Sequence, residues 1–177
     1  MKNILLPTDL TVQSLSPIHN IVRDAKNEKL AIHVVHMLHL PTSITDLLFI
    51  KEKNHFTSVP ENFSEAFQML RNKYKTSLES ITLKFVYCNT SRYLNNFIEG
   101  NYIDEVYMLS NYTYQQPLPE SVKFEGYINK CKAPLHKLPL GEGAFSEYQI
   151  LSSLLINNEQ YEDASSKMDT KTKVSYS

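Results

Sequence analysis

The chain has 177 residues, with 18 Lys and Arg against 19 Asp and Glu, so its formal net charge is -1. This length suits one ordinary domain plus an appendage, and the near-neutral charge excludes a general electrostatic attraction to nucleic acid or to an anionic membrane. No apolar stretch approaches the ~20 residues of a membrane span, the start lacks the pattern of a secretory signal, and two distant cysteines suit a reducing compartment, so we expect a cytoplasmic protein.

The chain opens on a short apolar run that predicts a buried strand. Ile4, Leu5 and Leu6 are continuous, and Pro-Thr-Asp follows directly, which puts Asp9 at the carboxyl end of this strand. Ligands of open parallel sheets bind beyond the carboxyl ends of the strands, so Asp9 is a candidate ligand-facing acceptor. A turn or helix-capping carboxylate is an equally good interpretation of this residue.

The following elements alternate between helical and strand periodicities. Residues 39–60 predict a loop with a turn or two of helix, and Asn62 and Ser64 are candidate caps of the helix after it. Asn89 or Thr90 caps the next helix, which Gly100 ends as a left-handed terminator. The patterns predict strands at residues 30–38, 81–87, 105–109 and 133–139, and helices at residues 15–25, 63–78, 90–100 and 122–131.

Strands that alternate with helices in this way predict an α/β fold: a doubly wound five-stranded parallel sheet with helices on both faces. The strand at residues 30–38 is polar only at His33 and His36, which is typical of a strand covered on both faces. The alternation at residues 81–87 and the prolines that flank the last strand place these two strands at sheet edges. We expect an α/β domain over residues 1–140 and a C-terminal extension over residues 141–177.

Several segments in this order resemble the universal stress proteins. They are KNILLPTD at residues 2–9, VVHM at 34–37, IDEVYML at 103–109, Ser121-Val122, Cys131 and APL at 133–135. The resemblance covers residues 1–139, and it implies an adenine nucleotide alpha hydrolase-like fold and a stress-response or regulatory role.

The resemblance also implies where a nucleotide would lie. ATP-binding members carry Gly-x-x-Gly, nine residues and then Gly-Ser after the fourth strand. In them the counterpart of Asp9 contacts the adenosine part, and the counterpart of Val34 or Val35 lies near the base, although core packing is the preferred explanation of these two valines, since apolar strand residues are normally buried. The candidate cofactor-binding residues are therefore Asp9, Val35, Ser110, Asn111 and Ser121.

The segment at residues 110–121 departs from that pattern. It holds no glycine, two prolines and two tyrosines. Backbone N–H groups must approach phosphates closely, which side chains obstruct, and proline has no N–H to donate. We therefore expect a degenerate nucleotide-binding site and no cofactor, with ATP or AMP held by Asp9 and a non-standard loop as the alternative.

Other chemistry has less support. His33, His36 and His39 invite a metal site, but odd and even offsets on a strand point to opposite faces, so His33 and His36 cannot share an ion. No nucleophile elbow or phosphate loop is present, and we expect a protein without enzymatic activity. The tyrosines around the fourth strand either fill the space of a lost nucleotide or line a pocket for another small ligand: Tyr102, Tyr107, Tyr112, Tyr114 and Tyr127.

The extension has two parts. Its apolar residues at helical spacing predict one short amphipathic helix able to dock on the edge of the last strand, and its remainder is predicted to be disordered. The family resemblance implies a homodimer through the last strand, which begins near Ala133 and ends near Leu138. We expect a non-enzymatic module that acts through dimerisation and contacts with an unknown protein partner, without nucleic acid or membrane.

Overall fold

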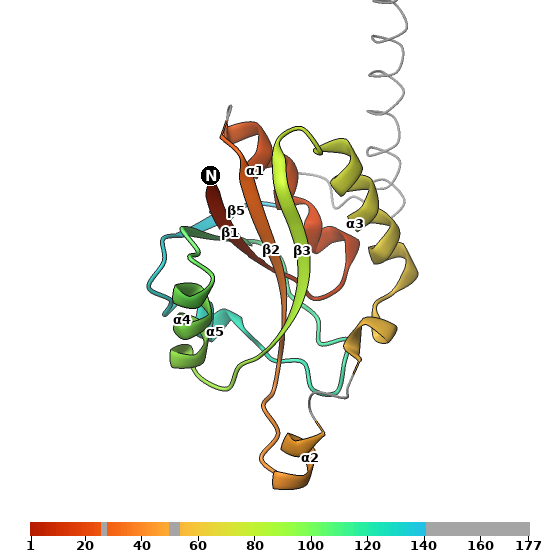
Figure 1. Cartoon of the computed structure of the whole chain (residues 1–177), viewed down its shortest axis with the longest axis vertical. Helices are drawn as coiled ribbons and strands as arrows, with labels where there is room; N and C mark the ends of the chain where they lie inside the picture. The colour runs from red at the N-terminus through yellow and green to blue at the C-terminus, as the bar shows by residue number, and fades with distance from the viewer. Residues whose placement is uncertain (26–27, 50–53, 141–177) are drawn as a thin grey trace, which may run out of the picture.

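A computed structural model of the chain describes residues 1–25, 28–49 and 54–140. Five strands form one sheet in the order β3-β2-β1-β4-β5, and every neighbouring pair is parallel. The predicted fold class is confirmed, as are the positions of two strands at the edges. The strands are β1 (Lys2–Pro7), β2 (Leu30–Leu38), β3 (Leu78–Tyr87), β4 (Glu105–Leu109) and β5 (Leu135–Leu138), labelled in Figure 1.

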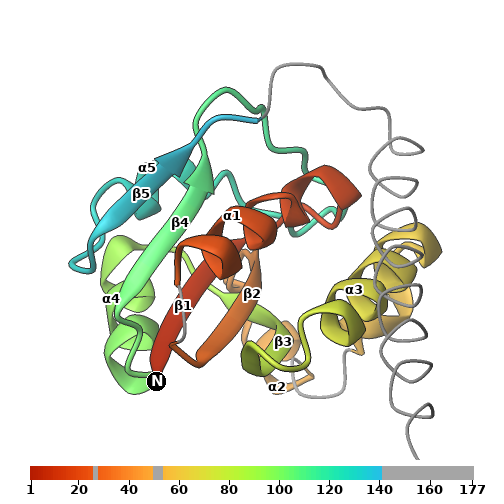
Figure 2. The ribbon, with the colours of Figure 1, turned by 90° about the horizontal axis from the view of Figure 1, so that it is seen from above.

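Helices cover both faces of the sheet, which makes three layers (Figure 2). On one face lie α1 (Pro17–Asp24), α3 (Glu61–Lys73) and the 3-10 helix η1 (Val12–Leu15). On the other face lie α4 (Ser91–Gly100) and the short α5 (Glu125–Ile128). The connection from β2 to α3 holds α2 (Ile44–Leu48), which protrudes at the bottom of Figure 1, and the 3-10 helix η2 (His55–Ser58).

The central strands divide the core into two apolar clusters. In β2, Ile32 and Val34 join the cluster beneath α1 and α3, whereas Val35 and Met37 join the cluster beneath α4 and α5. Successive side chains of a strand point to opposite faces, so a continuous apolar run serves both layers. The prediction that β2 is covered on both faces is confirmed.

Some predicted helix boundaries are wrong. The helix predicted over residues 63–78 ends at Lys73, and Leu78 begins β3, because a chain of turns at residues 74–77 redirects it. Neither Asn62 nor Ser64 caps it, since Pro60 holds the N-cap position.

The two later helices also differ from prediction. Thr90 does cap α4, accepting a hydrogen bond from the Tyr93 amide. Gly100 is the last helical residue rather than a left-handed terminator, and the left-handed residue is Tyr102, with φ of 52°. The helix predicted over residues 122–131 is reduced to the four residues of α5, because the segment before it pairs with the end of β2.

The strand order fixes where a site can form. The chain passes from β1 to β2 on one side and from β3 back to β4 on the other, so β1 and β4 are neighbours at the point where the order reverses. Ligands of such sheets bind beyond the carboxyl ends at this point. Asp9 follows β1, and residues 110–121 follow β4, so both belong to this edge.

Within the described residues, no helix combines the length and apolarity needed to cross a bilayer. The amphipathic helix and the polar tail predicted beyond residue 140 lie outside the part of the chain that the structure describes.

Candidate functional site

Asp9 is buried at the switch point and is bonded to its own chain on both carboxylate oxygens. It is 1% exposed. Oδ1 accepts hydrogen bonds from the backbone N–H of Thr11 at 3.2 Å and from the Thr11 hydroxyl at 2.6 Å. Oδ2 accepts from the Tyr112 hydroxyl at 2.7 Å and from the backbone N–H of Gln115 at 2.9 Å. Local turn bonds hold one oxygen, and the loop after β4 holds the other.

Hydrogen-bond donors surround Asp9. All four groups that bond to it are donors, and a carboxylate is an acceptor on both oxygens. The hydroxyls of Thr11 and Tyr112 also lie 2.8 Å apart. Both hydroxyls also lie within hydrogen-bond distance of the Asp9 carboxylate. The carboxylate therefore organises the two hydroxyls.

The backbone beside Asp9 is strained. Leu10 has φ of 61°, a left-handed conformation that is uncommon for a residue other than glycine and costs on the order of 1–3 kcal/mol. Its amide donates to the Thr8 hydroxyl at 3.0 Å, and its side chain is buried in the core beneath α1. The hydroxyls of Thr8 and Ser14 bond to each other at 2.6 Å, which ties this turn to η1. The turn is thus held from several directions in the conformation that aims Asp9 at the loop.

Two tyrosines of the loop pack into the site. The Tyr112 and Tyr114 rings meet edge to face at 4.8 Å, and Tyr114 meets Phe124 in the same way at 4.6 Å. Tyr114 is 7% exposed, and its hydroxyl accepts a hydrogen bond from the Leu109 amide at 2.9 Å. Burial raises the pKa of Tyr114 to about 12. Burial, together with the nearby Asp9 carboxylate, also raises the pKa of Tyr112, although the Thr11 hydroxyl opposes it. Both tyrosines are therefore neutral at neutral pH, and Tyr112 is the one that donates to Asp9.

A second buried cluster ties the far end of the loop to β2. His36 Nδ1 donates to the Thr8 carbonyl at 2.8 Å, and His36 Nε2 lies 3.0 Å from the Ser121 hydroxyl. Burial lowers the pKa of His36, outweighing its hydrogen bond to Thr8 and the attraction of Asp9. A neutral ring that donates from Nδ1 accepts at Nε2, so Ser121 donates to it. The Ser121 hydroxyl in turn accepts from the Leu118 amide at 3.0 Å.

The His36–Ser121 pair has the spacing of a nucleophile and its base, but its surroundings are those of a structural contact. Both side chains are buried, His36 at 2% and Ser121 at 4% exposure. The Leu118 amide is already bonded to the Ser121 hydroxyl, so it cannot stabilise an oxyanion at the same time. The pair therefore fastens the loop to the sheet.

The predicted site residues divide into two groups. The first group is buried near the carboxyl ends of the central strands and consists of Asp9, Val35 and Ser121. Val35 is a core residue whose carbonyl accepts a hydrogen bond from the Thr8 amide at 2.9 Å. Ser110 and Asn111 are exposed and bond to the chain at the end of β5. The Ser110 amide donates to Leu138, and the Asn111 side chain bonds to the backbone of Leu140.

Sequence reasoning missed the partners of these residues. Nothing in the sequence indicates that Tyr112 rather than Tyr114 reaches Asp9, because both follow β4 within a few positions. The contact between His36 and Ser121 spans 85 positions, so no local pattern indicates it. Among the described residues, no three His, Cys, Asp or Glu side chains gather as metal ligands would. His33 and His36 lie on opposite faces of β2, because Ile32 and Val34 face one cluster and Val35 and Met37 the other.

Comparison with known proteins gives similarity in structure alone. No protein-family model matches the sequence, and no curated protein matches it. The chain is similar in structure to universal stress proteins. One from Lactobacillus plantarum is 11% identical, with 77% of this chain and 97% of that chain covered and a TM-score of 0.49. One solved in complex with cAMP is 16% identical, with 79% and 98% covered and a TM-score of 0.46. A family protein from Arabidopsis thaliana with AMP bound is 6% identical, with 78% and 92% covered and a TM-score of 0.44. The strand order, not these similarities, establishes the fold.

Proposed function

We propose that this chain is a universal stress protein-like module without enzymatic activity, in which the loop at residues 110–121 replaces a bound nucleotide. The observation that carries the proposal is that both carboxylate oxygens of Asp9 already accept two hydrogen bonds each from the protein. These oxygens accept from Thr11, Tyr112 and Gln115, so a ligand that used Asp9 would first have to displace the loop.

The backbone of the loop supports the same conclusion. The amides of Ser110, Gln115, Leu118 and Ser121 already donate within the protein, and residues 117 and 119 are prolines without an N–H. A phosphate cradle needs several free N–H groups that point to one place. These four amides and the two prolines are therefore not available to such a cradle.

A calorimetric titration of the full chain with ATP, ADP, AMP and cyclic AMP tests the proposal. We expect no binding heat from any of them, with the AMP-bound relative as the positive control for the assay. Asp9→Asn is the companion variant because it keeps the side-chain volume. Micromolar binding of ATP or AMP that Asp9→Asn abolishes at unchanged melting temperature would overturn the proposal and establish a nucleotide-binding protein.

We further propose that the module works as a homodimer through β5. This strand lies at the edge of the sheet, and among the described residues no strand pairs with its outer side, where a second copy could pair. Light scattering coupled to gel filtration should give twice the 20.5 kDa chain mass. A monomer at every concentration tested would refute this part of the proposal and leave the first part standing.

A further inference from the structure

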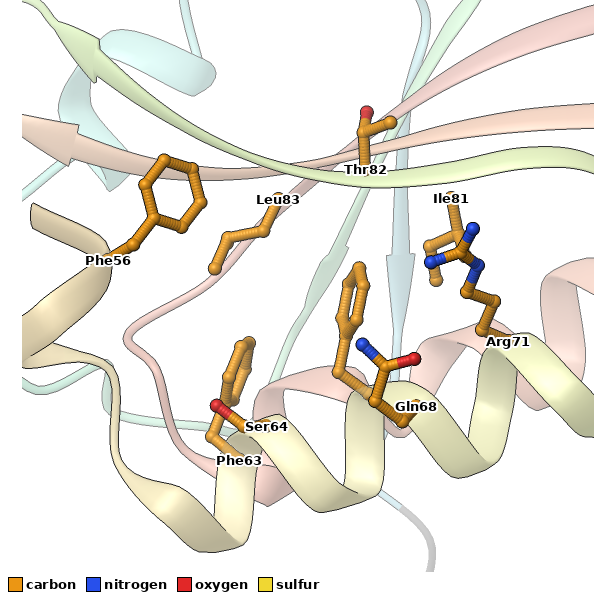
Figure 3. A pocket seen from close by; sticks show the side chains of 9 residues that line it. Phe56, Phe63, Ser64, Gln68, Arg71, Ile81, Thr82 and Leu83 are labelled. Atoms are coloured by element: carbon orange, nitrogen blue, oxygen red, sulfur yellow. The ribbon is translucent and has the colours of Figure 1, made fainter.

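A groove lies between α3 and β3, on the opposite side of the domain from the β5 edge. We call it the α3–β3 groove. Its apolar part has a volume of about 330 Å³ and is lined by both elements and by η2. Figure 3 shows Phe56 at one end and Arg71 at the other, with Leu83 and Thr82 on the strand side and Phe63 on the helix side.

The floor of the groove is apolar and incompletely covered. Phe63 and Ile81 are buried core residues that reach its wall, at 0% and 6% exposure. Phe56 is 59% exposed, although its ring meets Phe85 edge to face at 5.2 Å. An aromatic ring left open beside an apolar cavity is typical of a surface that another segment covers.

The rim of the groove carries more positive than negative charge. A more polar part of about 730 Å³ continues past Arg71 to Lys75, with Glu79 as the one carboxylate among the residues that line it. Within the described ranges, no acidic side chain pairs with Arg71 or Lys75. The groove therefore suits an apolar segment that carries negative charge.

The sequence beyond residue 140 has this chemistry. Between residues 141 and 166 it contains no Lys or Arg, and its acidic residues are Glu142, Glu147, Glu159, Glu162 and Asp163. Its apolar residues recur at helical spacing over residues 145–155: Phe145, Tyr148, Leu151, Leu154 and Leu155. We propose that residues 145–155 dock in the α3–β3 groove of the same chain, with the apolar side chains on the floor and the acidic flank at Arg71 and Lys75.

The chain is long enough for this contact. Four strand spacings of ~4.8 Å separate β5 from β3, about 19 Å in all. Phe145 lies five residues beyond Leu140, so an extended connection spans up to ~17 Å at ~3.3 Å per residue, and the helical residues 145–151 add ~9 Å, which gives ~26 Å in all. The 11 residues of 145–155 are about 16 Å long as a helix, which is close to the ~15 Å of the α3 wall from Ser64 to Lys73 at the same ~1.5 Å rise.

The α3–β3 groove is a better docking site for residues 145–155 than the edge of β5, where the sequence analysis predicts that this helix docks. β5 has four residues and is flanked by prolines, whereas β3 is a ten-residue edge strand beside a cavity. A long unpaired edge is a site of unwanted association unless a segment of the protein covers it. Docking at β3 also leaves β5 free for a second copy.

Thiol labelling of a cysteine in the groove tests the proposal on the full chain. Gln68 lines both parts of the groove, is exposed, and points from α3 toward β3 in Figure 3, so Gln68→Cys reports whether the groove is covered. Cys88 is buried, Cys131 is partly buried, and burial raises the pKa of both thiols, so we expect slow background labelling, which is measured on the chain without Gln68→Cys.

Two double substitutions in the tail supply the comparison. Leu151→Asp with Leu155→Asp places charge on the apolar stripe and should make labelling about tenfold faster, which corresponds to about 1.4 kcal/mol of docking free energy. Ser146→Asp with Ser153→Asp adds the same charge on the opposite side and should leave the rate unchanged. Arg71→Glu should also speed labelling in the full chain, and should have no effect once the two leucines are replaced.

Each remaining outcome overturns the proposal. Equal labelling rates in the leucine variant and the parent show that these residues do not cover the groove. Protection that weakens as the protein is diluted shows that the tail of a second copy covers it. Neither result depends on nucleotide binding, so the proposed function is tested separately.

Discussion

Replacing Tyr112 with Phe isolates the contact between the loop and Asp9. The substitution removes one hydroxyl and keeps the ring that packs against Tyr114. The lost hydroxyl donates to Asp9 Oδ2 at 2.7 Å, and Asp9 is 1% exposed. Hydrogen bonds to charged groups contribute about 1.5–3 kcal/mol, and water cannot easily replace this one because the carboxylate is buried. We expect Tyr112→Phe to lower the free energy of unfolding by about that amount.

Urea denaturation followed by far-ultraviolet circular dichroism measures this loss. The matched control is Tyr93→Phe, because Tyr93 is 50% exposed and belongs to α4, away from the site. That variant should stay within about 0.5 kcal/mol of the parent, as is usual for surface substitutions. The urea m-value should stay the same in both variants, since neither changes the surface exposed on unfolding.

A double-mutant cycle with Asp9→Asn assigns the effect to the pair. The asparagine side chain has one acceptor oxygen instead of two, so Tyr112→Phe should cost clearly less in the Asp9→Asn background. A loss below about 0.5 kcal/mol in the parent, or an equal loss in both backgrounds, would refute the conclusion that Asp9 holds the loop in place.

Three further predictions follow from other contacts. Burial and the charge of Lys73 lower the pKa of His19 from 6.5 to about 4, so the unfolded chain binds more protons than the folded chain between these pH values. About 3 kcal/mol of stability should therefore be present above pH 6.5 and lost toward pH 4. In His19→Gln, the free energy of unfolding measured by urea denaturation should vary less with pH over this window. A parallel pH profile in His19→Gln would contradict this. Ser121→Ala removes the partner of buried His36 and should cost about 1–3 kcal/mol, with faster hydrogen exchange at residues 115–122; unchanged exchange there would show that the pair does not fasten the loop. Leu48 is 73% exposed on α2, so Leu48→Asp should change the melting temperature little, and a loss above about 1 kcal/mol would mean that another surface covers α2.

Local pattern predicted the strands well because their periodicity is short and distinctive. The run at residues 30–38 and the run at residues 105–109 match β2 and β4 to the residue. Helix ends were predicted less well. Apolar spacing continues from Phe63 to Leu78 although the helix ends at Lys73, because Leu78 faces the same core cluster as a strand residue. A period shows which side chains are buried, and it does not show where the backbone changes conformation.

The sequence by itself determined the α/β class, the sheet edges and the presence of Asp9 beyond the first strand. It also determined that the segment after β4 lacks glycine, since that is a matter of composition. Only the tertiary structure decided what Asp9 contacts. Tyr112 and Gln115 are 103 and 106 positions away, and they reach Asp9 because β1 and β4 become neighbours in the sheet. Such a contact depends on strand order and on the path of one loop, and local sequence encodes neither.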